Sequence, residues 1–329
     1  MLPKNKSKLI IVPIAIILVI SALFWWKNTH QSKLAYLRFD TLLETNQNGI
    51  ISEIMPRPNS FFLVETSGRI HLTSKELCVL ESVAKYHPTN QVYLLLTSPI
   101  FQDENFEVVK KKYGNLQAKY LHVPSLIYGS PISDLSWIEI IEDSKYSVSH
   151  LSDLLRYLIL YNFGGTYLDL DALVIKALPN LTNFLGRESL QYEYLAAGVL
   201  RFQRDHPILV RFLQYLKYNF DGQDWSANGP TLVTKVMQEL CRTPALSQMT
   251  PEKCLGIYVF DPQAFYPVPW RNWKDLYKTE LNHELNDSYS VHLWGRHSRQ
   301  IKLEDLPEKT AIIKLTKTHC PITLNIINP

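Results

Sequence analysis

Short apolar runs alternate with helically spaced apolar residues from about residue 60 onward. The short runs are predicted to be buried strands, and they cover residues 60–68, 91–98 and 116–123. Residues 72–88 carry apolar side chains at helical spacing up to Pro88, and a second helix is predicted before Gly114. Strand, helix, strand, helix, strand is the order of a parallel α/β sheet with right-handed crossovers. The ligands of such sheets bind beyond the carboxyl ends of the strands.

A longer helix that faces the core is predicted in SVSHLSDLLRYLILYNF, residues 147–163. Its apolar residues recur at the spacing of one helix face, namely Leu151, Leu154, Leu155, Leu158 and Ile159. Asp153 and Arg156 are three residues apart, so they lie together away from that stripe. Gly164 and Gly165 supply a left-handed exit from the helix. TYLDLDALVI, residues 166–175, is predicted to follow directly as a strand.

This strand contains two aspartates, Asp169 and Asp171, interleaved with apolar residues. In an extended chain alternate side chains share a face, so Tyr167 and both aspartates point one way, while Leu168 and Leu170 point into the core. Two carboxylates roughly 6 to 7 Å apart on one face repel each other, and each tends to hold a proton. A divalent cation removes that conflict.

Mg²⁺ and Mn²⁺ prefer oxygen ligands, and they commonly share one or two carboxylates with the phosphates of a substrate. The pair Asp169 and Asp171 is therefore interpreted as a metal clamp for a diphosphate at a strand end. A solvated strand end or a turn is the alternative, because an isolated D-x-D arises often by chance. The neighbouring Asp153, Arg156 and double glycine favour the metal clamp.

The N-terminus carries an uncharged apolar run of eighteen residues from Leu9 to Trp26. At about 1.5 Å per residue it nearly crosses a hydrocarbon core. Trp25 and Trp26 stand where an interfacial aromatic belt belongs. A cleaved signal peptide is the alternative, but its apolar region is usually shorter and its cleavage site needs small residues. We expect a cytosolic tail at 1–8, a transmembrane anchor at 9–26, a stem at 27–57 and one lumenal catalytic domain at 58–329.

The four cysteines form no C-x-x-C pair, so zinc and thioredoxin chemistry are not indicated. Cys241 and Cys254 flank a loop that contains proline and has no periodic pattern, and they are predicted to form a disulfide. Cys78 and Cys320 then pair by default, unless Cys78 is simply a core residue. Asn180-Leu-Thr and Asn286-Asp-Ser are glycosylation sequons, which agree with a lumenal domain.

Composition narrows the class of protein. The chain has 329 residues, of which 46% are hydrophobic and 20% charged, so it forms a proper core. A net charge of +3 without a long basic run gives no support for nucleic acid as a partner.

The region DLLRYLILYNFGGTYLDLDALVIKALPNL resembles the lactosylceramide 4-alpha-galactosyltransferase family, within the D-x-D-containing GT-A glycosyltransferases. The likeness extends over residues 58–325 in further blocks, in the same order, among them FFLVETSG, NGPTLVTKV, FDPQAFYPVPWRNW and SVHLWGRHS. The resemblance implies a GT-A α/β fold and a type II Golgi membrane enzyme. It also implies α-linked transfer with retention from a UDP-sugar, typically UDP-galactose or UDP-N-acetylgalactosamine, to a glycolipid such as lactosylceramide.

The resemblance also assigns roles to individual residues. Asp169 and Asp171 bind Mn²⁺ (or Mg²⁺) and the UDP moiety, with Tyr167 beside them, while Asp153 and Arg156 reach the donor sugar and its phosphates. His292 is a late ligand of the metal or the diphosphate; a packed histidine at a strand end is the equal alternative. The remaining residues implied to approach the donor are Glu65, Thr66, Asn228 and Gly229. Glu65 and Thr66 are equally well ordinary polar residues at a strand end, and Asn228-Gly229-Pro230 is predicted to be a turn.

One departure from the family concerns the identity of the sugar. Mammalian members have an Asn-Gly pair before a buried strand, where this chain reads Leu195-Ala196-Ala197-Gly198. That Asn is a plausible contact of the donor sugar, so its absence leaves the transferred sugar open. Tyr266, Trp270 and Trp273 lie in a segment fixed by prolines, which cannot be regular helix, and they serve either as an acceptor platform or as packing.

Two other classes of protein fit this sequence less well. A phosphatase of the haloacid-dehalogenase type also places D-x-D after a buried strand, but that motif opens its domain and needs a later lysine and a second acidic pair. Here DLD follows three strands, and neither DD nor GDxxxD occurs downstream. A catalytically inactive Golgi binding protein is disfavoured by the intact Asp153, Arg156, Asp169 and Asp171. Among transferases, a donor such as GDP-mannose or UDP-N-acetylglucosamine is the alternative.

Overall fold

The computed structural model describes residues 56–57, 59–134 and 136–328. The expected anchor at 9–26, the tail before it and nearly all of the expected stem lie outside the described residues. Within the part of the chain that is described, no helix is long and apolar enough to cross a membrane.

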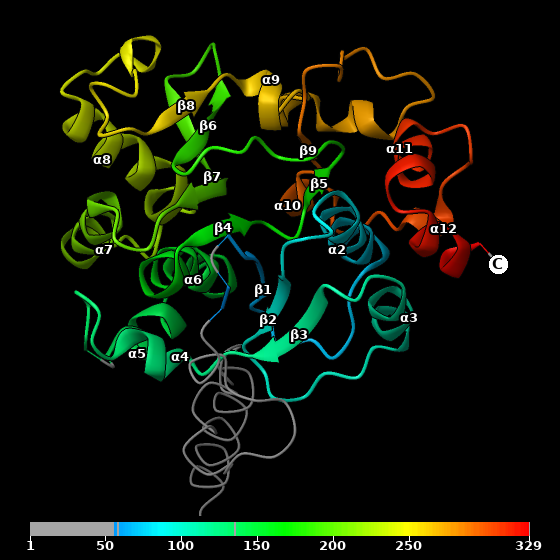
Figure 1. The fold of residues 1–329 in the computed structure, drawn as a ribbon, viewed down its shortest axis with the longest axis horizontal. Coiled ribbons are helices and arrows are strands. Elements are labelled where there is room, and N and C mark those ends of the chain that lie inside the picture. Colours follow the sequence, from blue (N-terminus) through cyan, green and yellow to red (C-terminus); the bar gives the residue numbers. More distant parts are fainter. Residues whose placement is uncertain (1–55, 58, 135, 329) are drawn as a thin grey trace, which may run out of the picture.

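A mixed seven-stranded sheet organises the fold, in the order β3-β2-β1-β4-β7-β6-β8 (Figure 1). Its strands are β1 (Phe61–Glu65), β2 (Val92–Leu96), β3 (Leu116–Tyr120), β4 (Gly165–Leu168), β6 (Phe184–Ser189), β7 (Tyr194–Phe202) and β8 (Tyr258–Phe260). The pairs β1–β2, β2–β3 and β1–β4 are parallel, which confirms the predicted parallel α/β unit. The other half is new relative to that prediction, because β7 runs antiparallel to both β4 and β6.

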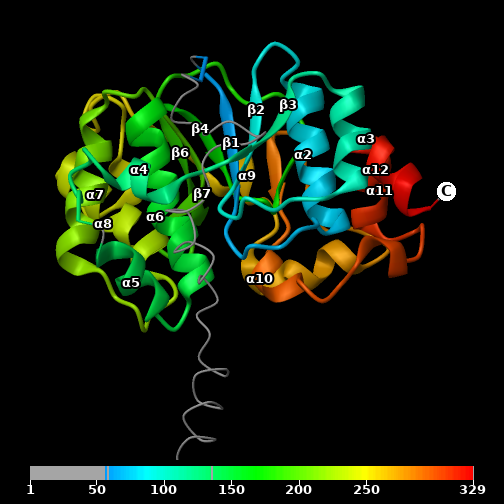
Figure 2. The same ribbon diagram turned by 90° about the horizontal axis from the view of Figure 1, so that it is seen from below.

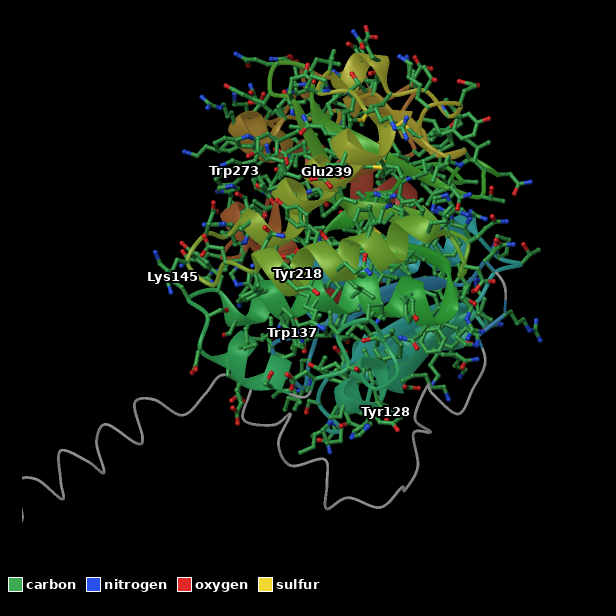
Figure 3. The ribbon with its side chains drawn as sticks, turned by 90° about the vertical axis from the view of Figure 1, so that its left-hand side faces the viewer. Tyr128, Trp137, Lys145, Tyr218, Glu239 and Trp273 are labelled. Carbon is green, nitrogen blue, oxygen red and sulfur yellow. A yellow bond between two sulfur atoms is a disulfide. The ribbon has the colours of Figure 1, made fainter. Side chains whose placement is uncertain are left out.

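Helices cover both faces of the sheet, as the two ribbon views show (Figures 1 and 2). One face carries α2 (Ser74–Tyr86), α3 (Glu104–Lys112), α11 (Ala311–His319) and α12 (Pro321–Ile327). The other carries α4 (Val123–Ile127), α5 (Ser136–Glu142), α6 (Ser147–Phe163), α7 (Pro207–Asn219) and α8 (Leu232–Cys241). On this second side α5 carries Trp137 (Figure 3). The Trp137 ring packs edge to face against the Phe220 ring, with 5.7 Å between the ring centres.

Strand β1 shows why the strands are apolar throughout. Phe61 and Leu63 belong to the core beneath α2 and α3, whereas Phe62 and Val64 belong to the core beneath α6. All four side chains are buried. A strand covered on both faces needs apolar residues at every position, which explains the continuous run FFLV.

Helix α2 begins and ends close to where the sequence predicts. The Thr73 side chain accepts a hydrogen bond from the Glu76 amide, and the Glu76 carboxylate accepts one from the Thr73 amide, which is a complete capping box. The helix stops at Tyr86, two residues before Pro88. Helix α6 ends in turn at Gly164 and Gly165, both of which have positive φ.

The predicted continuous strand through DLD is wrong. Strand β4 ends at Leu168, the chain turns through Asp169–Asp171, and β5 (Ala172–Val174) then pairs with β9 (Ser290–His292) in a separate two-stranded sheet. Tyr167 is buried and its hydroxyl lies on the side of Asp169, as predicted, whereas Leu170, predicted to point into the core, is only half-buried. Because the aspartates lie in a turn between two sheets, strand alternation does not determine where their carboxylates point.

Two further expectations about local structure need correction. Residues Ala227–Thr231 form one wide helical turn, η3, that runs into α8, so Asn228-Gly229-Pro230 is not an isolated turn. The proline-rich segment is irregular only as far as Pro269, because residues Trp270–Tyr277 form a 3₁₀ helix, η5. The departure LAAG lies inside β7 rather than before a strand.

Both predicted disulfides are present. Cys241 at the end of α8 bonds to Cys254, with 4.5 Å between their Cα atoms. Cys78 in α2 bonds to Cys320, the residue between α11 and α12. No described cysteine is free.

Candidate functional site

A pocket of about 1430 Å³ opens at the carboxyl ends of β1 and β4. Of the ten residues predicted for the site, eight line the pocket, and they come from four separate parts of the chain: Glu65 and Thr66 at the end of β1, Asp153 and Arg156 on α6, Tyr167, Asp169 and Asp171 in and after β4, and His292 at the end of β9. Asn228 and Gly229 do not.

Asp169, Asp171 and His292 converge in this pocket. Each offers one ligand atom, and these atoms lie within 4.8 Å of one another. His292 Nε2 is 3.1 Å from Asp171 Oδ1 and 3.8 Å from Asp169 Oδ2. The side chains of the two aspartates remain about one quarter exposed, at 25% and 24%, so both carboxylates are open to the pocket.

Backbone hydrogen bonds fix this convergence. The Asp169 amide donates to the Gly198 carbonyl at 2.8 Å, which ties the start of the turn to β7. The Leu293 amide donates to the Asp171 carbonyl at 2.7 Å, and Ala172 pairs with His292 in the β5–β9 ladder. The two-stranded sheet therefore brings residue 292 beside a motif more than 120 positions earlier, which no local sequence pattern reveals.

Two glycines leave room for the carboxylates. A Cβ at Gly198 would lie 2.7 Å from Asp169 Oδ2 and 3.3 Å from His292 Nε2. A Cβ at Gly295 would lie 3.0 Å from Asp171 Oδ2, and the Gly295 amide donates to the same oxygen at 2.6 Å. Any other residue at Gly198 would crowd the Asp169 carboxylate, so the backbone itself forms the wall of this cradle.

Arg156 is a support for Asp169 within the protein. Its guanidinium is paired with Asp153 at 3.0 Å and with Asp169 at 3.2 Å, and it donates to the Ala197 carbonyl at 3.2 Å. Only 7% of its side chain is exposed. The expected reach of Arg156 to a phosphate is thus limited by these three contacts, although its buried Nε has no hydrogen-bond partner among the described residues.

Tyr167 and Asp153 also belong to this support. The Tyr167 hydroxyl donates to Asp169 Oδ1 at 2.8 Å and contacts the Ser152 hydroxyl at 2.9 Å. Asp153 is buried against Gly229, where a Cβ would approach its Oδ1 to 2.6 Å. The side chain of Asn228 binds the amide and carbonyl of Asp221. Asn228 and Gly229 therefore shape the wall behind Asp153 rather than the pocket surface.

The electrostatics divide the site into charged and neutral parts. Burial acts to raise the pKa of Asp169, but the charges of Arg156 and His292 and a hydrogen bond from Tyr167 lower it to about 2. Burial acts to lower the pKa of His292, but Asp171 and Asp169 raise it to about 10. Burial raises the pKa of Asp153 to about 7 despite Arg156. In the metal-free protein a protonated His292 thus takes the place of a cation between the two carboxylates.

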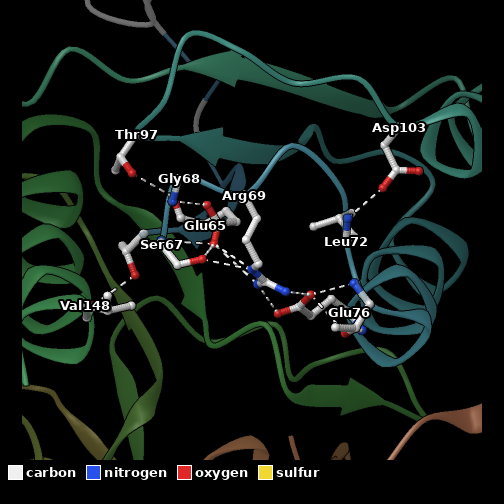
Figure 4. Close-up of polar contacts among 11 residues, drawn as sticks. Glu65, Ser67, Gly68, Arg69, Leu72, Glu76, Thr97, Asp103 and Val148 are labelled. Carbon is white, nitrogen blue, oxygen red and sulfur yellow. Dashed lines mark hydrogen bonds and ion pairs between the residues drawn. The ribbon is translucent and has the colours of Figure 1, made fainter. Parts of the chain in front are cut away.

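Glu65 and Thr66 are largely occupied by their own surroundings (Figure 4). The Glu65 carboxylate accepts hydrogen bonds from the amides of Ser67 and Gly68 at 3.0 and 2.9 Å, and it pairs with Arg69 at 3.3 Å. The Thr66 hydroxyl donates to the Val148 carbonyl at 3.0 Å. Both residues therefore hold the loop that forms the β1 side of the pocket, which favours the interpretation of Glu65 and Thr66 as polar residues at a strand end.

Several residues of the pocket were missed from sequence. Lys75 is buried, donates to the Ser298 hydroxyl at 3.1 Å, and lies near enough to Asp171 for their charges to interact. Arg296 stacks over Trp225 at 4.2 Å at another part of the pocket. Glu188 of β6 also lines it. A lone lysine or glutamate in a helix or strand has no sequence signature, so only the fold identifies them.

The aromatic platform is only partly in the pocket. Tyr266 and Trp270 line it, whereas Trp273 does not. Trp270 stacks on His297 at 5.8 Å, and Trp273 stacks on the same ring at 6.2 Å. Tyr266 is buried, and its hydroxyl has no partner among the described residues.

The residues of this site fit a divalent cation. Two carboxylates and one imidazole converge on one point, and glycines on both sides keep the space beside them open. Carboxylate oxygens are ligands that suit Mg²⁺ and Mn²⁺, and the imidazole adds a nitrogen ligand for a divalent metal. Like charges that close together are stable only with a positive partner between them.

Comparison with known proteins assigns the chain to a family. Residues 73–190 match the glycosyltransferase sugar-binding region containing the DXD motif, and residues 201–327 match the alpha 1,4-glycosyltransferase conserved region. Lactosylceramide 4-alpha-galactosyltransferase of Mus musculus is 33% identical over 81% of this chain and 75% of its own length. The Homo sapiens enzyme of that name is 30% identical over 82% and 77%. Alpha-1,4-N-acetylglucosaminyltransferase of Homo sapiens is 25% identical over 83% and 82%.

Solved structures align more loosely. The PaToxG glycosyltransferase aligns with a TM-score of 0.42 and 18% identity over 56% of this chain and 70% of its own. The galactosyltransferase LgtC, in complex with donor and acceptor sugar analogs, aligns with a TM-score of 0.34 and 15% identity over 62% and 74%. The DXD match implies a divalent metal and a nucleotide-sugar donor, for which the pocket has the ligands. The chain belongs to the lactosylceramide 4-alpha-galactosyltransferase family, and it is an alpha-1,4-glycosyltransferase with a GT-A-like fold.

Proposed function

We propose that this protein transfers galactose or N-acetylgalactosamine from its UDP-sugar, with retention, to a glycolipid acceptor such as lactosylceramide. The observation that supports the proposal most is the convergence of Asp169, Asp171 and His292 in one large pocket. These residues would hold Mn²⁺ or Mg²⁺ together with the diphosphate of the donor. The mammalian relatives that share about a third of the sequence are named for the same reaction class.

The chain's own residues prepare the donor end of the pocket. Arg156 and Tyr167 hold one oxygen of Asp169, so that its other oxygen, Oδ2, remains turned toward His292. The Gly295 amide holds Asp171 Oδ2 and leaves Oδ1 free to act as a ligand. A bound divalent cation stabilises the negative charge that develops on the departing diphosphate. Lys75 adds a buried positive charge beside Asp171 for the same leaving group.

The size of the pocket supports binding of donor and acceptor together. Its volume, about 1430 Å³, exceeds the roughly 300–1,000 Å³ of a pocket for one small ligand. Trp270 and Tyr192 line the pocket beside the Arg271 guanidinium, which lies 5.0 Å from the centre of each ring. Sugars present apolar C–H faces that stack on such rings, so we place the acceptor glycan at this end.

The proposed location is the Golgi membrane, with the domain 58–329 in the lumen behind the anchor at 9–26 and the stem at 27–57. Two disulfides favour an oxidising compartment. Both sequon asparagines, Asn180 and Asn286, are exposed, as glycosylation requires. A shift in mobility after glycosidase treatment, and resistance of the protein to carbonate extraction, are the expected results.

A second donor is the competing proposal. The alpha-1,4-N-acetylglucosaminyltransferase of Homo sapiens covers as much of this chain as the galactosyltransferases do. Ala196 and Ala197 line the pocket and carry no polar group that would recognise a sugar hydroxyl. UDP-N-acetylglucosamine is therefore included in the test, as is GDP-mannose.

The test is a turnover assay of the purified lumenal domain with Mn²⁺. UDP-galactose, UDP-N-acetylgalactosamine, UDP-N-acetylglucosamine and GDP-mannose are each offered with lactosylceramide and related glycolipids, and the anomeric configuration of the product is read by NMR. Transfer of one of the two galactose-type sugars in α-linkage is expected. Absence of transfer from every donor would refute the proposal, and a β-linked product would refute retention.

A further inference from the structure

Glu188 differs from the other carboxylates in the pocket. Asp153, Asp169, Asp171, Glu65 and Glu76 each have a cationic or hydrogen-bonding partner. Glu188 is half-buried and lines the same pocket, yet it makes no hydrogen bond or ion pair with any described residue. An acid removed from water without a partner is costly unless a ligand uses it.

The pocket lining places Glu188 on the side of the metal ligands. Strand β6 departs from regular pairing on both sides of Arg187, so strand alternation does not decide where Glu188 points. Arg187 is buried and pairs with Asp261 at 3.2 Å, whereas Glu188 lines the pocket together with Tyr266 and His292. Glu188 is also near enough to both of these side chains for its charge to act on them.

Tyr266 is an independent indication of a ligand at this place. Its side chain is buried, it lines the pocket, and its hydroxyl has no partner among the described residues. The Tyr266 ring lies 5.4 Å from the His292 ring. An unpaired hydroxyl and an unpaired carboxylate next to a diphosphate site match the hydroxyl-rich surface of a hexose.

The chemistry of the donor locates its reacting atom. In a UDP-hexose the anomeric carbon is bonded to the diphosphate oxygen, so it lies next to whatever holds the diphosphate. Glu188 lines the same pocket as His292 and is near enough for their charges to interact, so it lies on the side where that carbon would be held. Retention of configuration can arise from two successive inversions, which require a carboxylate on the face opposite the leaving group.

We propose that Glu188 is the catalytic nucleophile of this transferase, an inference that rests on the proposed function of the same pocket. In the first step a Glu188 oxygen forms a bond to the anomeric carbon, the carbon–oxygen bond to UDP breaks, and its electron pair leaves with UDP. In the second step the acceptor hydroxyl oxygen bonds to that carbon, the bond to Glu188 breaks, and its electron pair returns to the carboxylate. The hydroxyl proton passes to the UDP diphosphate. Tyr266 positions the hexose through one hydroxyl.

The test uses three variants of the lumenal domain, Glu188→Gln, Glu188→Ala and the control Glu280→Gln. Glu280 is exposed and makes no hydrogen bond or ion pair with described residues, so the control should equal the wild type. Each protein is assayed with Mn²⁺, the UDP-hexose that the wild type uses, and lactosylceramide. Folding is checked by near-UV circular dichroism. Glu188→Ala is also assayed with sodium azide in place of the acceptor.

Glu188→Gln should lower kcat by about 10³-fold or more and leave KM for the donor within about threefold, because a nucleophile acts on the transition state. In Glu188→Ala the azide ion should enter the vacated space and give a β-glycosyl azide, the inverted product. A Glu188→Gln enzyme with more than about a tenth of wild-type kcat would overturn the proposal. So would folded, inactive variants without any glycosyl azide, which would leave Glu188 a binder of sugar hydroxyls. If the wild type transfers none of the UDP-hexoses, the proposed function is refuted as well. If the wild type is active, the results for the variants bear on the role of Glu188 alone.

Discussion

Two acidic clusters stand at strand ends in the same pocket, and they differ in what surrounds their carboxylates. After β1, Glu65 is 2% exposed and is held by the amides of Ser67 and Gly68 and by Arg69, which also pairs with Glu76 (Figure 4). After β4, Asp169 and Asp171 are about one quarter exposed, and each keeps an oxygen open toward His292.

The difference separates a structural acid from a functional one. Glu65 spends its two oxygens on its own loop, with Oε1 bound by Ser67 and Arg69 and Oε2 by Gly68, so it adds order to that loop. The turn at Asp169–Asp171 satisfies one oxygen of each aspartate within the protein and leaves the other directed at His292, in a group that carries two like charges. Such an arrangement is unfavourable without a cation, and it therefore indicates a binding site.

The largest expected effect on transfer activity is that of replacing Asp171. Replacement by Asn removes one charge at nearly constant volume, so transfer should fall by about 10²–10³-fold or more, while the fold persists. The free energy of unfolding, measured in urea with EDTA, should change by less than about 1 kcal/mol. The measurement is Mn²⁺-dependent transfer beside the control Asp205→Asn, an exposed aspartate in the turn between β7 and α7. Near-normal activity of Asp171→Asn, or a wild type that works equally well in excess EDTA, would contradict the metal site.

A change in the support of Asp169 sharpens the comparison. Lysine at position 156 cannot contact Asp153, Asp169 and the Ala197 carbonyl at once, as the guanidinium does. Arg156→Lys should therefore weaken the apparent affinity for Mn²⁺ by about 10–100-fold, because groups behind the ligands orient them. A Mn²⁺ titration of activity, with intrinsic fluorescence as a second reading, measures this. An unchanged titration midpoint with lower kcat would instead mean that Arg156 acts on the substrate.

The cluster after β1 should respond in the opposite way. Glu65→Gln removes the charge that Arg69 and two amides share, and it should cost about 2 kcal/mol of unfolding free energy. Arg69 is 40% exposed, so water replaces part of what is lost. Transfer at saturating donor should fall by less than about tenfold. If activity vanished while stability remained, Glu65 would be a donor ligand after all, and the proposed contrast would fail.

The smallest effect concerns pH in the metal-free protein. The pKa of His292 is raised to about 10 in the folded state from about 6.5, so its stabilising contribution is fully present below pH 6.5 and is lost as the pH rises toward 10. The difference in unfolding free energy between wild type and His292→Gln, measured in EDTA, should therefore shrink across that window. A difference that stays constant from pH 6.5 to 10 would show that His292 is a neutral packed residue.

The sequence predicts the first half of the fold well because the signals there are local. Thr73 with Glu76 marks a helix start, Pro88 a helix end, and FFLV a strand buried on both faces. The antiparallel β7 and the second sheet escaped prediction because their pairing depends on residues far apart in the chain. The same holds for the turn at Leu170. An apolar residue between two aspartates has the alternating pattern of a strand, but the chain turns there because Ala172–Val174 pair with the distant strand β9.

The site follows the same rule. Asp169 and Asp171 carry a short motif, so their position in the pocket could be expected, and His292 was open between two roles. No local sequence pattern distinguishes Lys75, Glu188 or Gly198. Only the fold shows that these residues line the same pocket as the carboxylates. Asn228 is the opposite case, because it was predicted to contact the donor but does not line the pocket. Its side chain is hydrogen-bonded to the amide and the carbonyl of Asp221.

The link between the first helix and the last residues has a consequence for the order of folding. Cys78 bonds to Cys320 across 242 positions, and Glu81 of the same helix accepts hydrogen bonds from the amides of Ile322 and Thr323 at 2.9 and 2.7 Å. During synthesis α2 emerges early, yet the Cys78 thiol has no disulfide partner before Cys320, and the Glu81 carboxylate has only the Tyr113 hydroxyl among its described partners until residues 322 and 323 are added. A chain that stops before Cys320 is therefore left with a free thiol and an incompletely paired acid in its core.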